Sequence, residues 1–178
     1  STPKPSSAAS DVYKRQFLRK DVRLISEFEP RDELLAIPVA RVRRTASAGY
    51  ELDTTFIAPS LSLTASGALH EQLRRLLDAL QAKVNALYGF HREPSKNIIE
   101  FRSGDVASFW LLHTANEAYA TLSHLFHHPQ LHPERLFQEL ARLAGALMTF
   151  SKVHTLADLP VYRHDAPGPA FALSLIHI

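Results

Sequence analysis

Residues 66–88 read SGALHEQLRRLLDALQAKVNALY, and this stretch decides the class of the fold. Its apolar side chains recur in steps of three and four, which places them along one face of an α-helix. Ser66 suits the N-cap of that helix, and Gly89 and Pro94 are expected to end it. The helix would be about 33 Å long. Its stripe consists of Leu69, Leu73, Leu76, Leu80, Val84 and Leu87, and Leu77 widens it.

Two more helices are expected, over residues 103 or 105 to 127 and 133 to 150. The first carries the apolar run Phe109–Leu112, which includes Trp110 and is expected in the core. The second begins at Pro133, a favoured first helical position. Its apolar stripe includes Leu136, Leu140, Leu143 and Leu147. Together with the stripe of residues 69–87, these leucines are the expected packing residues, either inside a bundle or along an oligomer seam.

Short connections between three long helices favour antiparallel neighbours. The three stripes either close into a three-helix bundle or leave one side for a fourth helix that starts near Pro169. In the second case, part of residues 69–87 or 136–150 should be under-buried. The fragment should then self-associate, because large exposed apolar surface marks an interaction face.

The segment before the helices has the residue pattern of β-strands. Residues 34–44 and 50–57 flank a short turn that contains Gly49, which predicts a hairpin. Asp21–Phe28 is a candidate third strand. Pro38 cannot donate to a ladder, so the strand within residues 34–44 is expected to lie at an edge or to begin near Pro38. Two or three strands form a marginal sheet on their own. The sequence therefore predicts an α+β, mainly α chain with a short β element followed by a truncated antiparallel helical bundle.

The chain is expected to have four parts. Residues 1–16 are expected to be a disordered, non-native tail, because residues 1–10 are polar and small and Asp11–Gln16 resembles translated adaptor sequence. Residues 17–62 are the end of a β domain, and residues 63–151 are the helical bundle. Residues 152–178 are an irregular tail with a non-native end at Leu173–Ile178.

Composition narrows the function. The 178 residues include 20 Lys and Arg against 18 Asp and Glu and no cysteine, for a net charge of +2. This excess is too small for a dedicated nucleic-acid binder, and a thiolate site is excluded. Apolar runs of about seven residues fall well short of the 20 or so that cross a bilayer. A cytoplasmic protein without direct membrane insertion is expected.

Histidine provides the main candidate for chemistry. His124 and His128 stand four residues apart, the spacing that places two imidazoles on one helical face for zinc. No carboxylate lies between them, and Glu134 is the nearest. A metal-dependent enzyme built on this pair is therefore the alternative function, while no catalytic residue, cofactor or metal is expected.

Two arginine groups raise the other alternative, a nucleic-acid-binding helical module. Arg41, Arg43 and Arg44 lie on the expected hairpin, and Arg74 and Arg75 lie on the first helix. An exposed face kept soluble by charge accounts for both groups more simply.

Polar residues interrupt the apolar face of the second helix. Asn116 and Glu117 follow the expected core residues at helical steps. Two interpretations stay open: a buried hydrogen-bonded network that sets the helix register, or side chains that reach solvent at the edge of the stripe.

Several blocks of sequence, in order, resemble one family. They are FIAPSLSLTAS at 56–66, FHREPS at 90–95, FWLLHTANE at 109–117, HPERL at 132–136 and LAGALMTFS at 143–151. The chain is similar over about residues 25–170 to the TssK (ImpJ, VasE) family of type VI secretion baseplate components. Gly67 departs from the proline expected after the serine, which weakens the start of the first helix.

The resemblance implies a non-enzymatic, homotrimeric adaptor. It implies that a β-sandwich shoulder precedes a four-helix neck, of which three helices are present, and that a head domain follows. It further implies that the shoulder engages the wedge subunits TssF and TssG and that the head reaches the membrane-complex proteins TssL and TssM. The chain would then be cytoplasmic and associated with the inner-membrane secretion complex.

Overall fold

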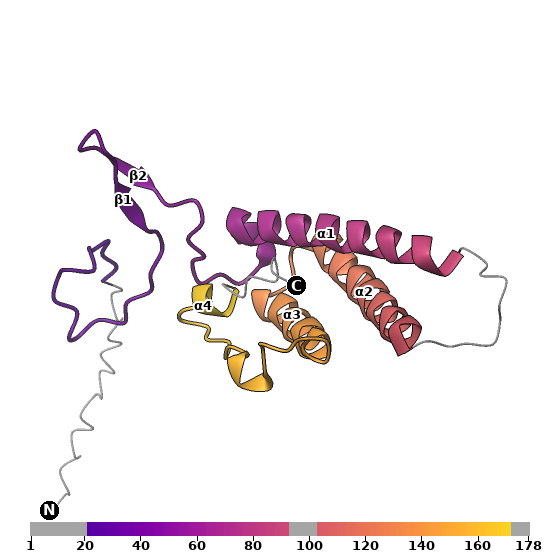
Figure 1. The fold of residues 1–178 in the computed structure, drawn as a ribbon. Helices are drawn as coiled ribbons and strands as arrows, with labels where there is room; N and C mark the ends of the chain where they lie inside the picture. The colour runs from indigo at the N-terminus through magenta and orange to yellow at the C-terminus, as the bar shows by residue number, and fades with distance from the viewer. Residues whose placement is uncertain (1–20, 93–102, 172–178) are drawn as a thin grey trace, which may run out of the picture. The chain divides into compact units, whose positions relative to one another are not determined.

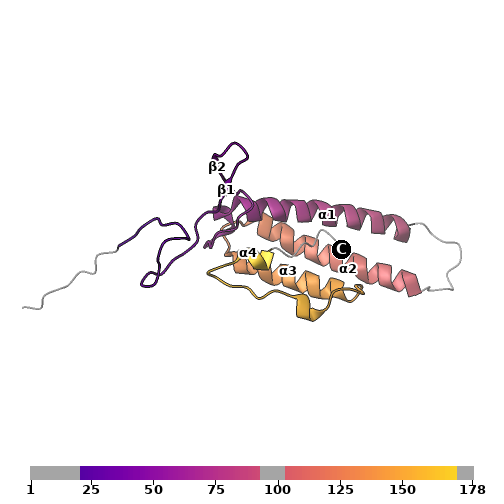
Figure 2. The same cartoon turned by 60° about the vertical axis from the view of Figure 1, so that its left-hand side comes forward.

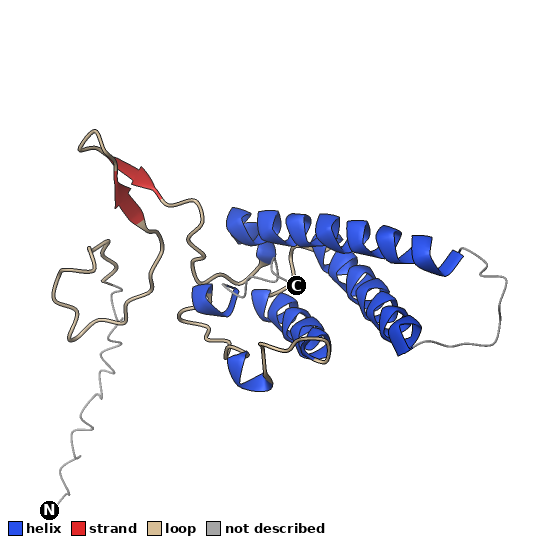
Figure 3. Cartoon of the chain, viewed as in Figure 1, coloured by secondary structure: helices blue, strands red, loops and turns tan. Residues whose placement is uncertain are grey.

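The computed structural model describes residues 21–92 and 103–171. The chain divides into two compact units, residues 1–36 and residues 37–178. In the second unit, a hairpin of two strands precedes a set of helices that make up most of its regular structure (Figures 1 and 3). The expected fold class, mainly α with a short β element, is confirmed. The predictions for residues 1–20 and 172–178 and for the link after the first helix lie outside the described residues.

The expected third strand is wrong. Residues 21–28 form no strand, and Val22, Leu24 and Phe28 are almost fully exposed. The hydrogen bonds of this segment are local, such as the one that the Glu29 N–H donates to the Ser26 carbonyl at 3.1 Å. A strand needs the backbone groups of a neighbour, which apolar alternation alone does not supply.

The hairpin is shorter than expected. Strands β1 (Val42–Arg44) and β2 (Tyr50–Leu52) pair antiparallel, with Val42 opposite Leu52. Residues 37–41 and 53–57 add no strand, although the Asp53 N–H still donates to the Arg41 carbonyl at 2.8 Å. Pro38 has no N–H for a ladder. Ala48 closes the turn at φ 62°, a left-handed conformation that favours glycine.

Helix α1 (Gly67–Arg92) begins where expected and runs longer than expected. Ser66 caps it: the Leu69 N–H donates to the Ser66 Oγ at 3.3 Å, and the His70 N–H donates to the Ser66 carbonyl at 3.1 Å. Gly89 does not end the helix, since helical structure continues to Arg92. A single glycine costs a helix about 1 kcal/mol, which the preceding turns can offset.

Replacing Ser66 with Ala should lower the free energy of unfolding by about 1 kcal/mol, because the variant leaves the Leu69 N–H without its side-chain acceptor. Urea denaturation followed by circular dichroism would measure the change. Ser66→Asp, which restores an acceptor, serves as the control and should recover most of the loss. An unchanged midpoint in the alanine variant would contradict the cap.

Helices α2 (Ser103–His127) and α3 (Pro133–Met148) follow the expected bounds closely. Helix α2 packs against both α1 and α3, and the three run antiparallel to their neighbours (Figure 2). Pro133 opens α3, and the ring of His132 caps it by accepting the Glu134 N–H at Nδ1, 3.1 Å away. Helix α3 ends two residues earlier than expected, so Phe150 lies outside it.

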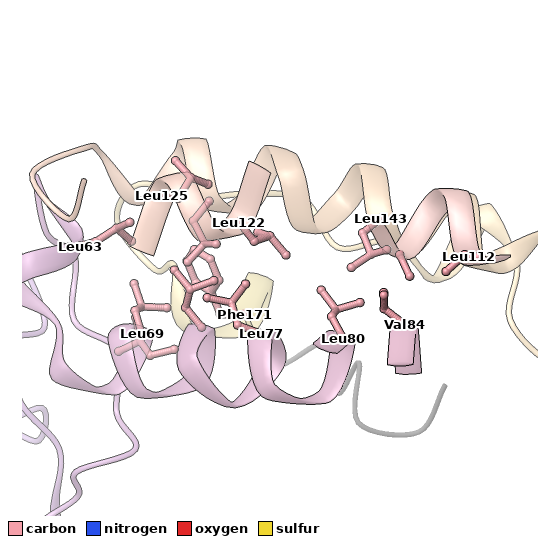
Figure 4. Packing of buried hydrophobic residues seen from close by; sticks show 14 of the residues in the cluster. Leu63, Leu69, Leu77, Leu80, Val84, Leu112, Leu122, Leu125, Leu143 and Phe171 are labelled. Atoms are coloured by element: carbon pink, nitrogen blue, oxygen red, sulfur yellow. The ribbon is translucent and has the colours of Figure 1, made fainter. Parts of the chain in front are cut away.

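The core lies between these helices (Figure 4). Leu122 of α2 is completely buried, and Leu136 and Leu69 are nearly so. The 3₁₀ turn η1 (Leu63–Ala65) inserts Leu63 into the same core. Its backbone is tied to the turn between α2 and α3, because the Leu63 N–H donates to the Leu131 carbonyl at 3.0 Å.

The chain after α3 is mostly irregular, as expected, but it returns to the core. The 3₁₀ turn η2 (Leu156–Asp158) is followed by the short helix α4 (Gly168–Phe171). Phe171 is buried in the core cluster, and Tyr162 packs against it. A helix therefore does start near Pro169, as one of the two sequence interpretations required.

Candidate interaction surfaces of the helical bundle

The predicted packing residues lie in the interior of a single chain. On α1 most of the stripe is buried, and Leu76 is half-buried. On α3, Leu140 and Leu147 are half-buried. The buried members are Leu69, Leu73, Leu80, Val84 and Leu87 on α1 and Leu136 and Leu143 on α3. The under-burial expected for these stripes is therefore limited to their flanks and to Phe150, which is 40% exposed.

Within the three long helices, the large apolar side chains with the highest exposure lie on α2. Val106, Phe109 and Trp110 are 44%, 57% and 54% exposed, and we call them the α2 aromatic patch. Steps of three and four residues place them on one face of the helix. The rings of Phe109 and Trp110 meet edge to face, with centroids 6.2 Å apart. The core position expected for these two residues is wrong, whereas Leu112 is buried as expected.

Helix lengths explain this exposure. Helix α3 has 16 residues and α2 has 25. Because α3 starts from the short turn after His127 and runs back along α2, it ends before it reaches the first turns of α2 (Figure 2). The patch lies on those first turns. Among the described residues, no element on the α3 side is long enough to cover this apolar surface.

Two polar residues of α2 link it to its neighbours. The Asn116 Nδ2 donates to the Tyr88 Oη of α1 at 3.2 Å. Glu117 forms an ion pair with Arg142 of α3, and Arg142 also lies 3.6 Å from Glu139. These side chains are partly exposed, so the structure favours the edge-of-stripe interpretation and adds a cross-helix partner for each. The sequence could not supply these partners.

A pocket beside that ion pair is too small for a substrate. Its volume is about 40 Å³, and Thr114, Glu117 and Arg142 are among the residues that line it. Ligand pockets usually measure about 300–1,000 Å³. The charged side chains that line it are paired with each other, so the pocket is a polar contact region between α2 and α3.

The histidine pair of the alternative function is close in space but is not joined by a carboxylate. The rings of His124 and His128 stack with centroids 4.1 Å apart, and the His128 Nδ1 lies 2.8 Å from the His124 carbonyl. Among the described residues, the group that could hold a metal is a different one: His132, Glu134 and His164. The sequence did not reveal that group, because His164 lies 30 residues further along the chain than Glu134.

Two of the three hairpin arginines of the nucleic-acid alternative have carboxylate partners. On the hairpin, Arg43 lies 3.6 Å from Glu51 and Arg41 lies 3.8 Å from Asp53. Hydrogen bonds that Thr55 donates lower the pKa of Asp53, and the positive charges of Arg43 and Arg41 lower it further. These surfaces are mixed in charge, and such surfaces attract phosphate weakly.

The arginine group on α1 is similarly paired. Glu71 accepts hydrogen bonds from Arg74 at 2.7 Å and from Arg75 at 2.9 Å, and these bonds lower the pKa of Glu71 to about 2. Arg74 also reaches Asp78 at 3.2 Å. The carboxylate of Glu71 therefore stays ionised far below neutral pH and keeps this part of α1 close to charge balance.

Within residues 21–92 and 103–171, none of the helices is both long and apolar enough to pass through a bilayer. The helical core and the exposed aromatic patch are together typical of a protein that packs against other proteins.

The family follows from a comparison with known proteins. The family model described as "Bacterial Type VI secretion, VC_A0110, EvfL, ImpJ, VasE" matches residues 6–176. The chain belongs to this family of bacterial type VI secretion proteins. The resemblance found in its sequence blocks is thereby confirmed.

A curated relative agrees with this. The type VI secretion system baseplate component TssK1 of Pseudomonas aeruginosa is 33% identical over 155 residues. The match covers 84% of this chain and 33% of TssK1. The chain thus spans about a third of that relative.

Solved structures agree as well. TssK of the EAEC type VI secretion system, in complex with a nanobody, is 41% identical with a TM-score of 0.68, and the match covers 76% of this chain and 48% of that one. The TssK-TssF-TssG baseplate subcomplex contains a chain that is 37% identical with a TM-score of 0.69. This second match covers 82% of the chain described here and 44% of its relative. The homologues of this chain are therefore type VI secretion baseplate components.

Proposed function

We propose that this chain is the central part of a non-enzymatic adaptor of the type VI secretion baseplate. In this proposal it links the wedge subunits TssF and TssG to the membrane-complex proteins TssL and TssM and works as a homotrimer in the cytoplasm, against the inner-membrane secretion complex. The family match over residues 6–176 carries the proposal. The relative found in a TssK-TssF-TssG subcomplex supports the wedge partners.

The proposal assigns a role to each part of the chain. Residues 17–62 form the end of a β shoulder, residues 63–151 form three helices of the neck, and residues 152–178 form a truncated tail. The exposure of Val42, Tyr50 and Leu52 in the hairpin supports the first assignment, because an isolated two-stranded sheet is marginal. Contacts with TssL and TssM would be made mainly by parts of the protein outside this chain.

The trimer surface is assigned to the α2 aromatic patch rather than to the leucine stripes. The stripe residues are largely used in packing within one chain, so they are not free to form a seam between chains. Phe109 and Trp110 are more than half exposed and belong to the residue types that dominate protein interfaces.

A chimera tests the adaptor role. The matching segment of the TssK that forms the TssK-TssF-TssG subcomplex would be replaced by this chain and co-expressed with TssF and TssG. We expect the chimera to co-purify with both proteins, because the shoulder and neck would be preserved. A matched chimera carrying Leu122→Pro, which breaks α2 in the core, should lose both partners. A well-folded chimera that captures neither TssF nor TssG would contradict the proposal.

A further inference from the structure

The start of α3 and the segment before α4 bring together three potential metal ligands. One ligand atom from each of His132, Glu134 and His164 lies within 4.8 Å of the other two. The His164 Nε2 is 3.9 Å from the Glu134 Oε2, and the rings of His132 and His164 have centroids 5.5 Å apart. Two imidazoles and one carboxylate are a ligand set that suits a divalent first-row transition metal.

Packing under the cluster holds the two segments in place. Pro133, which stands between two of the ligands, is fully buried, and so is Pro167 just beyond the third. Tyr162 packs on Phe137 of α3 with ring centroids 5.3 Å apart. The backbone positions of the three ligands therefore rest on a buried apolar base, while His164 itself is exposed and free to reorient.

From this geometry we propose that His132, Glu134 and His164 bind one Zn²⁺ ion. Ligand atoms around a tetrahedral zinc are about 3.3 Å apart, given bonds of about 2.0–2.2 Å. Closing the cluster from its present spacing requires rotation of the exposed His164 and half-exposed Glu134 side chains and release of the His132 cap. The fourth position would face solvent. The sequence predicts no metal and offers His124 and His128 as its candidate ligands, whereas the fold brings His164 to His132 and Glu134.

The hydrogen bond by which His132 caps α3 limits the affinity of the site for zinc. Its Nδ1 accepts the Glu134 N–H, so the neutral ring carries its proton on Nε2. While Nδ1 accepts this hydrogen bond the neutral ring has no other acceptor nitrogen, so a metal on either nitrogen displaces the bond. Zinc binding therefore competes with the helix cap, and we expect a dissociation constant in the micromolar range rather than the nanomolar range of closed structural sites.

Cobalt substitution tests the site. The 178-residue chain without a histidine tag would be titrated with Co²⁺ at pH 7.5, followed by displacement with Zn²⁺. We expect one equivalent per chain, visible absorption bands of tetrahedral Co²⁺, and loss of these bands when Zn²⁺ is added. His164→Ala should weaken binding at least tenfold with unchanged circular dichroism, since its side chain is 68% exposed.

Two further variants separate this site from binding by histidines elsewhere on the surface. His132→Asn keeps a capping acceptor but removes the imidazole, so it should weaken binding to the same extent without unfolding α3. The double variant His124→Ala, His128→Ala removes the stacked pair on α2 and should leave the affinity within twofold of the original. No saturable binding below about 100 µM would overturn the proposal. Binding that survives His164→Ala, or that is lost in the α2 double variant, would overturn it equally.

Discussion

Leu122→Ala is expected to lower the free energy of unfolding by about 3–5 kcal/mol. Leu122 is 0% exposed and lies in the core that α2 shares with its neighbours (Figure 4). Truncation removes the Cγ atom and both Cδ methyl groups and leaves a cavity that the helices on both sides can fill only partly. Urea denaturation followed by circular dichroism at 222 nm would measure the loss.

Leu61→Ala is the matched control for this experiment. Leu61 is 86% exposed, so the same chemical change should alter stability by less than about 0.5 kcal/mol. If the two variants lost similar stability, or if Leu122→Ala lost less than about 1 kcal/mol, α2 would not pack as described.

The second large effect is on assembly. Replacing both Phe109 and Trp110 with Ala should weaken self-association at least a hundredfold, because exposed aromatic anchors at an interface often contribute about 2 kcal/mol or more each. The unfolding free energy should change little, since more than half of each side chain is already exposed. Sedimentation velocity over a concentration series would compare the variant with the original chain.

The control for assembly removes apolar side chains elsewhere on the surface. Val153 and Leu156 are 80% and 71% exposed and lie after α3 in the sequence. Their double alanine variant should self-associate like the original chain. An original chain that stays monomeric at all concentrations, or two double variants with equal masses, would count against the α2 aromatic patch as the contact surface.

The two experiments probe different consequences of the same helix. Residues on the inner side of α2, such as Leu112 and Leu122, are committed to the core of one chain. On its first turns, Trp110 is 54% exposed. A protein that both folds and assembles through one helix needs this division, because a side chain buried within its own chain cannot also contact a second one.

The helices could be predicted from the sequence because their signals are local. The leucine spacing of residues 69–87 defines a face whatever lies opposite, and Ser66 caps α1 through groups only three and four residues away. Pro133 marks the start of α3 for the same reason, since its ring affects only its own turn. Even the start of a helix near Pro169 was visible in the chain itself.

Other features depended on which segments meet in space. Periodicity shows that Phe109 and Trp110 share an apolar face, but only the tertiary structure shows that both are more than half exposed. Residues 21–28 have the pattern of a strand but form none, because a ladder needs the backbone of a second strand beside it. Glu117 meets Arg142, and Glu134 approaches His164, across turns whose geometry no short stretch of sequence encodes. Local chemistry therefore determined the elements of this protein, whereas element lengths and long-range packing decided which side chains face the core, each other or a partner.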